Sequence, residues 1–297
     1  MNYVFKADQE TVERITSSFD KEYFRDPVAY RDYRIEYDNC IINIYTSGKV
    51  MFQGENARIY AASFFSLEEV EKQEEEKQAS PVSSFPQAGS DEVGTGDYFG
   101  PICVCACYMD KKIYRKVKQL NLIDSKQLTD KRILEIAPEL LKHVPHSLLI
   151  LDPEKYNSVH KESNLNKIKA LMHNKAYLNL KDKGIKLPKL TVIDQFCSIS
   201  AYYNYIKDEK EIVRNITFQT KAENSYVAVA CGAIISRYAF LKEMEKMSEK
   251  YQMEFPKGAG SKVDSFIREF VNRYGRDELA RVGKTDYKNT EKALSEQ

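Results

Sequence analysis

A change in composition about a quarter of the way along the 297-residue chain most constrains the fold. Residues 68–77 are mainly Glu and Lys, and residues 79–84 read Ala-Ser-Pro-Val-Ser-Ser, which is typical of a linker. Such a stretch has too few apolar side chains to continue a buried core. We therefore predict an N-terminal domain at residues 1–75, a linker at 76–88 and a second domain at 89–297.

The first part of the chain predicts a small α+β domain. Val12, Ile15 and Phe19 recur at helical spacing. Thr46-Ser47-Gly48-Lys49 is typical of a hairpin turn that joins two strands. The expected elements are a helix at 10–20, strands at 34–37, 40–45 and 50–53, and a helix at 56–70.

The second part alternates apolar strand-like runs with longer segments of helical periodicity. This alternation predicts an α/β layered domain. Thr129 is suited to cap the first long helix, and small residues at 228–233 would let another helix pack closely. The expected strands are 102–109, 147–151 and 189–194, and the expected helices are 129–144, 164–181, 225–247 and 263–274.

The overall charge does not indicate a nucleic-acid-binding protein, because 45 Lys and Arg balance 44 Asp and Glu. Any basic surface must therefore be local. Residues 111–132 contain eight Lys or Arg and two acids. This stretch could line a groove for a polynucleotide backbone, or it could be a solvated helix face.

The six cysteines include three that alternate along the strand at 102–109, and none forms a CxxC pair. This spacing suits small buried side chains in a reducing compartment better than disulfides or a zinc site. No run of 18 apolar residues and no signal peptide stands out, so we expect no membrane association and a cytoplasmic location.

Four acidic residues are candidate metal ligands: Asp91, Glu92, Asp194 and Glu223. Hydrolysis of a phosphodiester requires an activated water and stabilisation of the leaving oxygen, and two carboxylate-bound Mg²⁺ ions can provide both. Asp194 ends an apolar strand, and Glu223 comes at the start of a helix, where an ionised carboxylate is favoured. Taken singly, each acid has an ordinary explanation: an Asp-Glu pair is commonplace among 44 acidic residues, Asp194 could cap a turn, and Glu223 could be a favourable first-turn acid.

Asp91 and Glu92 are neighbours, so on a regular strand they would point to opposite faces of the sheet. Both could serve one site only at a strand end or an irregularity. Gly89, Gly94 and Gly96 flank the pair and would permit such a bend.

The combination of these motifs resembles the type 2 ribonucleases H. Asp91-Glu92-Val93-Gly94-Thr95-Gly96, followed by Gly100-Pro101, is similar to the family signature. Asp124-Ser125-Lys126-Gln127-Leu128, Val192-Ile193-Asp194 and Lys221-Ala222-Glu223-Asn224 resemble its other motifs in the family order. The Thr between the glycines, the Glu as fourth acid and the extra N-terminal domain resemble the ribonuclease HIII group rather than HII.

The resemblance implies an endonuclease that cuts the RNA strand of RNA–DNA hybrids and leaves 3′-hydroxyl and 5′-phosphate ends. Its catalytic domain would have a ribonuclease H-like layered fold. The N-terminal domain would resemble half of the TATA-binding protein and grip the hybrid. We expect a monomer with no obligate protein partner.

The resemblance also implies roles for individual residues. The four acids would be catalytic and would bind Mg²⁺ or Mn²⁺, with Asp91 bridging both ions. The backbone of Gly94, Thr95 and Gly96 would sense the ribose 2′-OH, and Ser125 and Lys126 would contact phosphate.

Three alternatives remain open: incision at single ribonucleotides in duplex DNA, as by ribonuclease HII; a non-catalytic hybrid-binding module; and a junction nuclease of related fold. One departure concerns residues 284–288, which read Lys-Thr-Asp-Tyr-Lys where the family carries a Lys-x-His-Phe-like stretch. The histidines at 143, 146, 160 and 173 have no metal-binding spacing, and we interpret them as structural or surface residues. Tyr45 and Phe52 could stack on nucleic acid or pack in the core.

Overall fold

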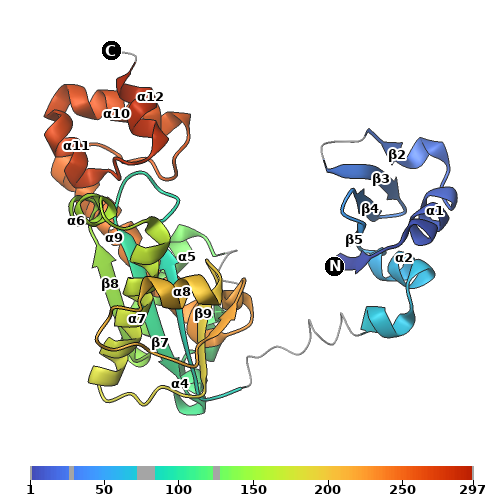
Figure 1. The fold of residues 1–297 in the computed structure, drawn as a ribbon, viewed down its shortest axis with the longest axis horizontal. Coiled ribbons are helices and arrows are strands. Elements are labelled where there is room, and N and C mark those ends of the chain that lie inside the picture. The colour runs from blue at the N-terminus through green and yellow to red at the C-terminus, as the bar shows by residue number, and fades with distance from the viewer. Residues whose placement is uncertain (1, 27–29, 72–83, 123–127, 296–297) are drawn as a thin grey trace. The chain divides into compact units, whose positions relative to one another are not determined.

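The chain forms two compact units, Met1–Ser80 and Pro81–Gln297, and each contains its own five-stranded sheet (Figure 1). The computed structural model describes residues 2–26, 30–71, 84–122 and 128–295. The prediction of an α/β fold with a separate small N-terminal domain is confirmed. The linker bounds of 76 and 88 remain predictions.

The N-terminal sheet is antiparallel, with strand order β1-β5-β4-β3-β2. Its strands are β1 Asn2–Lys6, β2 Phe24–Arg25, β3 Arg31–Tyr37, β4 Cys40–Tyr45 and β5 Lys49–Gly54. Helices α1 Gln9–Ser17 and α2 Ala57–Phe64 pack on one face through a shared apolar core. The sequence did not predict β1, because only Tyr3 and Phe5 alternate with exposed residues there.

The single helix predicted at 56–70 is wrong, because α2 ends at Phe64 and a new helical segment begins at residue 67. The break has a local cause. The Ser66 backbone N–H donates to the Glu69 carboxylate at 3.1 Å, and the Glu69 N–H donates to the Ser66 hydroxyl at 3.3 Å. This reciprocal pair is a capping box that starts the second helix.

The strand residues that alternate with the core positions form a second, polar surface of the N-terminal sheet, which we call the open face. Among the described residues, both helices pack on the opposite side. The open face consists of Asn2, Val4, Lys6, Arg34, Glu36, Ile41, Asn43, Tyr45, Lys49, Met51 and Gln53. Phe52 is fully buried in the core, so it is not part of this surface.

The larger unit is built on a mixed sheet with strand order β10-β9-β6-β7-β8. The central strand β6 runs antiparallel to β7 and parallel to β9. The strands are β6 Gln87–Val93, β7 Ile102–Met109, β8 His146–Leu151, β9 Leu190–Asp194 and β10 Thr217–Gln219. Central burial on both faces explains why β7 is almost continuously apolar.

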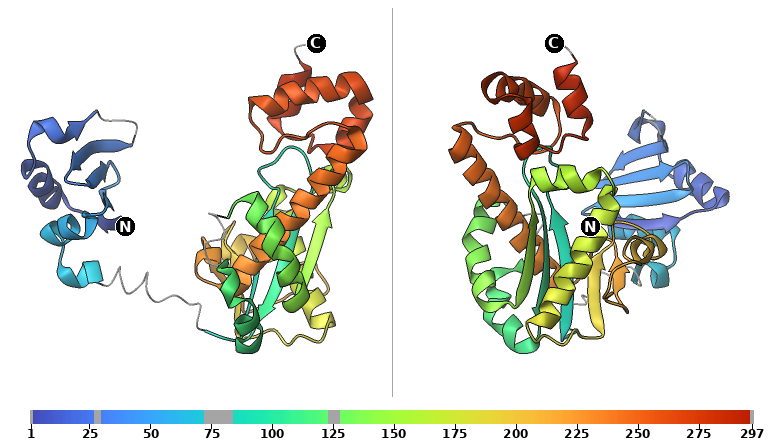
Figure 2. Two further views of the ribbon diagram at one scale, coloured as in Figure 1. Left: turned by 180° about the vertical axis from the view of Figure 1, so that it is seen from behind. Right: turned by 60° about the vertical axis from the view of Figure 1, so that its left-hand side comes forward.

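Helices cover both faces of this sheet (Figure 2). One layer contains α4 Lys111–Val117, α5 Asp130–His143 and α9 Val227–Tyr251. The other contains α6 Pro153–His160, α7 Leu165–Asp182 and α8 Ile199–Tyr205. The last helices, α10 Ser261–Tyr274, α11 Arg276–Val282 and α12 Lys288–Leu294, share a third core with Tyr98 and Phe99.

Helix α9 lies directly against the strands because two contact positions lack a side chain. A Cβ at Gly89 would stand 2.3 Å from the Val229 nitrogen, and one at Gly232 would stand 2.7 Å from the Cys105 oxygen. Both distances are too short for any real side chain. The predicted close packing by small residues is therefore confirmed, and it brings the start of α9 next to the end of β6.

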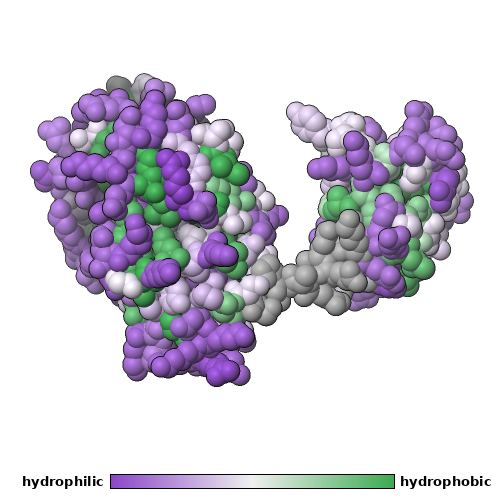
Figure 3. Space-filling model, turned by 60° about the horizontal axis from the view of Figure 1, so that its bottom comes forward, coloured by the Kyte–Doolittle hydropathy of each residue, from purple (hydrophilic) through white to green (hydrophobic). Residues whose placement is uncertain are grey.

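The described surface is largely hydrophilic, and the cysteines fit the prediction of small buried side chains. Hydrophilic side chains cover much of the visible surface in Figure 3. No described helix is long and apolar enough to cross a membrane. All six cysteines are free thiols, and only Cys197 is not buried.

Candidate active site

The site begins where β6 and β9 separate. Their parallel pairing stops at Ser90 and Ile193, whereas β6 continues beside β7 to Val93. Asp91 is the first β6 residue beyond this point, and Asp194 is the last residue of β9. Two carboxylates therefore meet at the carboxyl ends of neighbouring parallel strands, as expected for a site in such a sheet.

Glu223 reaches the same place from a 3₁₀ turn, Ala222–Asn224, just before α9. Lys221 precedes the turn with a left-handed backbone (φ 57°). The Ala222 N–H donates to the Asp194 carboxylate at 2.9 Å and ties the turn to the end of β9. Glu223 itself is 1% exposed, so its carboxylate is held inside the site.

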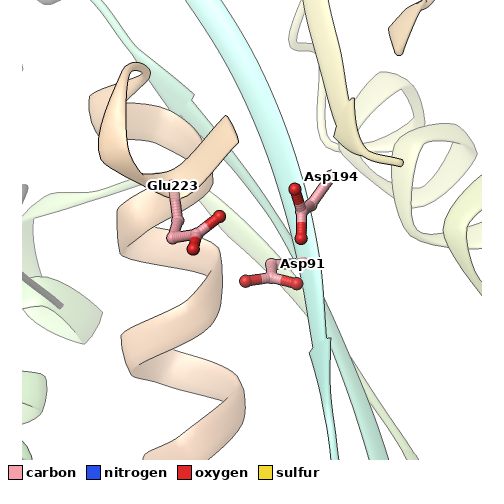
Figure 4. A group of neighbouring side chains, drawn as sticks. All are labelled: Asp91, Asp194 and Glu223. Carbon is pink, nitrogen blue, oxygen red and sulfur yellow. The ribbon is translucent and has the colours of Figure 1, made fainter. Parts of the chain in front are cut away.

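Asp91, Asp194 and Glu223 form what we call the acid cluster (Figure 4). One carboxylate oxygen from each residue lies within 4.8 Å of the others. Burial, together with repulsion from Glu92 and Asp194, raises the pKa of Asp91 well above its usual range. Clustered carboxylates of this kind can be balanced by protonation or by a bound cation, and their hard oxygen donors suit Mg²⁺ or Mn²⁺.

The fourth predicted acid, Glu92, lies outside this cluster. Strand β6 is regular here, with Asp91 opposite Cys105 and Glu92 opposite Val104, so the two acids point to different faces. The irregularity that the sequence suggested is absent from this described segment. Glu92 faces α7, where Lys169 Nζ donates to one of its oxygens at 2.7 Å.

His173 contacts the other Glu92 oxygen at 2.9 Å through Nε2, and its Nδ1 lies 2.7 Å from the Ser90 hydroxyl. Burial disfavours the charged form of Glu92, but the bond to His173 and the charge of Lys169 outweigh it and lower the pKa of Glu92. Although they point to different faces, Asp91 and Glu92 line the same pocket of about 350 Å³, which Glu223 also lines.

The Gly-Thr-Gly segment forms a turn directly after β6. Gly94 has φ +96°, and a Cβ there would stand 2.1 Å from the Pro101 oxygen, so glycine is required. Apart from Gly96 itself and its two chain neighbours, no described heavy atom lies within 4 Å of a Cβ placed on Gly96, and the residue is exposed, so its backbone is open to approach. The Thr95 carbonyl accepts a hydrogen bond from the Tyr287 hydroxyl at 2.6 Å.

The C-terminal helices brace this turn. The fully buried Lys284 donates through Nζ to the carbonyls of Asp97 at 2.7 Å and Gly100 at 2.6 Å. Burial lowers the pKa of Lys284 to about 8. The Asp97 side chain accepts from the Gly258 N–H at 2.6 Å. The segment that departs from the family pattern therefore supports the turn, and its Asp286 pairs with His160 at 3.1 Å.

Ser125 and Lys126 lie outside the described residues, so their predicted phosphate contacts remain predictions. The helix that follows them is described, and Thr129 caps it as predicted by accepting from the Arg132 N–H at 3.3 Å. Its first residue, Asp130, is bound by Arg237 at 2.9 Å and also by Lys257.

Sequence reasoning missed Lys169, His173 and Lys284. Lys169 and His173 are four residues apart, so they share a face of α7, but nothing in the sequence connects that face to Glu92. His173 was interpreted as structural or surface; it is fully buried, and it contacts a predicted metal ligand.

Comparison with known proteins assigns the chain to a family. A family profile described as ribonuclease HII matches residues 88–290, and a profile described as a domain of unknown function matches residues 2–77. Ribonuclease HIII of Bacillus subtilis is 42% identical over 265 residues, covering 86% of this chain and 84% of that protein. Ribonuclease HIII of Enterococcus faecalis is 36% identical and covers 98% of both chains.

Solved structures of ribonucleases H are also similar to this chain. The crystal structure of Bst-RNase HIII in complex with Mn²⁺ has a TM-score of 0.70 and 35% identity, and it covers 99% of this chain and 98% of its own. The ribonuclease H2 of Pyrococcus horikoshii, at 20% identity and a TM-score of 0.60, shares the fold over 71% of this chain and 98% of its own.

The fold and the matches define the chain as a type 2 ribonuclease H, an endoribonuclease that hydrolyses phosphodiester bonds. Within that class, it belongs to the ribonuclease HIII family.

Proposed function

We propose that this enzyme cuts the RNA strand of RNA–DNA hybrids, using two divalent cations held by Asp91, Glu92, Asp194 and Glu223. The observation that carries the proposal is the acid cluster, in which one carboxylate oxygen from each residue lies within 4.8 Å of the others. The Gly-Thr-Gly turn directly follows the strand that contains Asp91. The related Bst-RNase HIII was crystallised in complex with Mn²⁺. We propose Mg²⁺ or Mn²⁺ as the cofactor.

The residues of the cluster divide the work in this proposal. Such cations supply Lewis acidity and a more acidic water when bound. Asp91 would serve both ions in this proposal; it clusters with Asp194 and Glu223 and is followed directly by Glu92 in β6. No histidine is needed as general base. The products would carry 3′-hydroxyl and 5′-phosphate ends.

The Gly94–Gly96 turn supplies substrate selection in this proposal. Distinguishing RNA from DNA requires a contact to the 2′-OH. The open backbone at Gly96 lets a ribose approach, and the bond from Tyr287 fixes the orientation of the Thr95 carbonyl. A turn that is held on one side and open on the other can offer backbone groups in one arrangement.

The open face of the N-terminal unit would bind the hybrid backbone. Lys6 and Lys49 are directly paired across β1 and β5, and both are exposed. Gln53 on the same surface is partly exposed, and the buried Asn43 donates to it at 3.2 Å. Positive charges and amides on a sheet face suit phosphate and sugar contacts. We propose that the enzyme acts as a monomer without an obligate protein partner.

A substrate panel tests this function. The intact protein is offered a long RNA–DNA hybrid and, separately, a DNA duplex with one ribonucleotide, each with Mg²⁺ or Mn²⁺. We expect efficient cutting of the hybrid, with 3′-hydroxyl and 5′-phosphate ends identified by end-labelling. Cutting of only the second substrate would favour ribonuclease HII-like incision, and binding without any cutting would favour an idle module.

A further inference from the structure

Glu92 is held by two side chains that no step of the proposed reaction uses. Lys169 donates to one carboxylate oxygen at 2.7 Å, and His173 contacts the other at 2.9 Å. Both come from one face of α7. The pair therefore fixes both ends of a carboxylate that borders the pocket of the acid cluster.

The surroundings leave this arrangement little freedom. Lys169 is 8% exposed, and its Nζ also lies 4.0 Å from the centre of the Phe196 ring. His173 is fully buried, stacks on the same ring at 5.4 Å and contacts Ser90 through its second nitrogen. Buried polar groups are costly unless they are paired. Here hydrogen bonds link Ser90, His173, Glu92 and Lys169 in a continuous series, so the polar groups of all four side chains are paired.

Glu92 differs from the other three acids in its placement. The strand geometry points it away from Asp91, and the acid cluster excludes it. Each carboxylate oxygen has two lone-pair directions, so an oxygen that accepts one N–H can still face a cation. Hydrogen bonds of this kind orient metal ligands in proteins.

We infer that Lys169 and His173 are positioning residues that aim the Glu92 carboxylate at the pocket, so that Glu92 can serve as a metal ligand. The inference rests on the proposed function of the acids. Helix α7 contributes none of the four acids, and the inference gives it the role of orienting one of them.

Electron paramagnetic resonance can measure Mn²⁺ binding to the intact protein without substrate. This measurement distinguishes a positioning role of Lys169 and His173 from an effect of their charge alone. Removing a nearby positive charge should tighten cation binding by Coulomb's law. Removing a group that orients a metal ligand should instead weaken binding or activity, by about 10–100-fold. We expect Lys169→Met and His173→Asn to weaken Mn²⁺ binding, whereas His173→Gln, which keeps a donor toward Glu92, should retain it. Lys175→Met, an exposed lysine on the same helix, is the matched control.

A double-mutant cycle completes the test. In a Glu92→Gln background, Lys169→Met and His173→Asn should change Mn²⁺ affinity by less than about 2-fold. Unchanged or tighter binding in the single variants would overturn the inference, and so would a loss that persists in the Glu92→Gln background. Failure of the wild type to cut hybrids would instead count against the proposed function, since the binding measurement does not depend on cleavage.

Discussion

Among the described residues, each of the two sheets has five strands, but helices cover both faces of one sheet and only one face of the other. In the larger unit, helices cover both faces, so side chains of the inner strands β6 and β9 become exposed mainly where these strands end. In the N-terminal unit, the described helices cover one face and leave the other polar. From this difference we propose that the two units have separate roles, which we call the division of labour. The strand ends of the larger unit would carry the catalytic residues, and the open face of the N-terminal unit would bind the substrate. The predictions below test that division.

The largest effect is expected at the strand ends. Asp91→Asn should lower turnover by about 10³-fold or more, since charge stabilisation worth several kcal/mol is lost. The same change removes a carboxyl group whose ionised form is disfavoured by burial and by the neighbouring acids in the metal-free protein. We therefore expect the metal-free protein to melt about 2–4 °C higher, the shift that about 1 kcal/mol gives in a domain of this size.

Single-turnover cleavage and a thermal melt of the same sample provide these two readouts. A variant with normal turnover would remove Asp91 from the metal site. A lower melting temperature would show that Asp91 stabilises the fold rather than straining it.

Deletion of residues 1–80 should affect binding instead. The second unit has its own cores, so it should retain most of its turnover number, while KM for a hybrid rises by about 10²-fold because one of two linked binding surfaces is gone. Steady-state kinetics with circular dichroism as a folding check measure this split. A collapse of kcat in a folded deletion variant would break the division of labour.

A smaller effect is expected on the open face. Lys6→Ala with Lys49→Ala should weaken hybrid binding several-fold and reduce the slope of log Kd against log salt by about 2, one unit for each phosphate that is no longer neutralised. Lys21→Ala is the control, because Lys21 is exposed in a 3₁₀ turn outside the sheet. An equal change in slope for the control would assign the effect to overall charge.

The smallest effect concerns the bond between Tyr287 and Thr95. Tyr287→Phe keeps the ring but loses a hydrogen bond worth about 1 kcal/mol, so kcat/KM on hybrids should fall about 5-fold. Tyr274→Phe loses a similar bond of 2.6 Å to the Tyr251 carbonyl, away from the turn. If kcat/KM on hybrids falls equally in both variants, the effect is not due to the orientation of the Thr95 carbonyl.

Much of the fold could be predicted because local pattern and final environment agree. Strands β4 and β7 have the predicted bounds, since their apolar residues are buried where they fall in sequence. Strand β1 escaped prediction because its partner β5 lies more than forty residues away, and long-range pairing leaves little local signal. The break at Ser66 has a local sequence signal, the capping box formed by Ser66 and Glu69, which the single predicted helix at 56–70 does not take into account.

The acids of the site were predictable because motif order located them, but their grouping was not. Whether Glu92 joins Asp91 depends on the regularity of β6 and on where β9 stops pairing, and both are tertiary properties. The contacts of Lys169 and Lys284 depend on which helix packs against which strand or turn. No single-sequence pattern contains that information.

The location of bound metal tests the central claim most directly. Crystals of the intact protein soaked in Mn²⁺ would be measured for anomalous scattering at the manganese edge. We predict a peak between the carboxylates of Asp91, Asp194 and Glu223, and none at that position in Asp91→Asn. A fully occupied peak elsewhere, with no density among these three side chains, would contradict the assignment of the acid cluster as the metal centre.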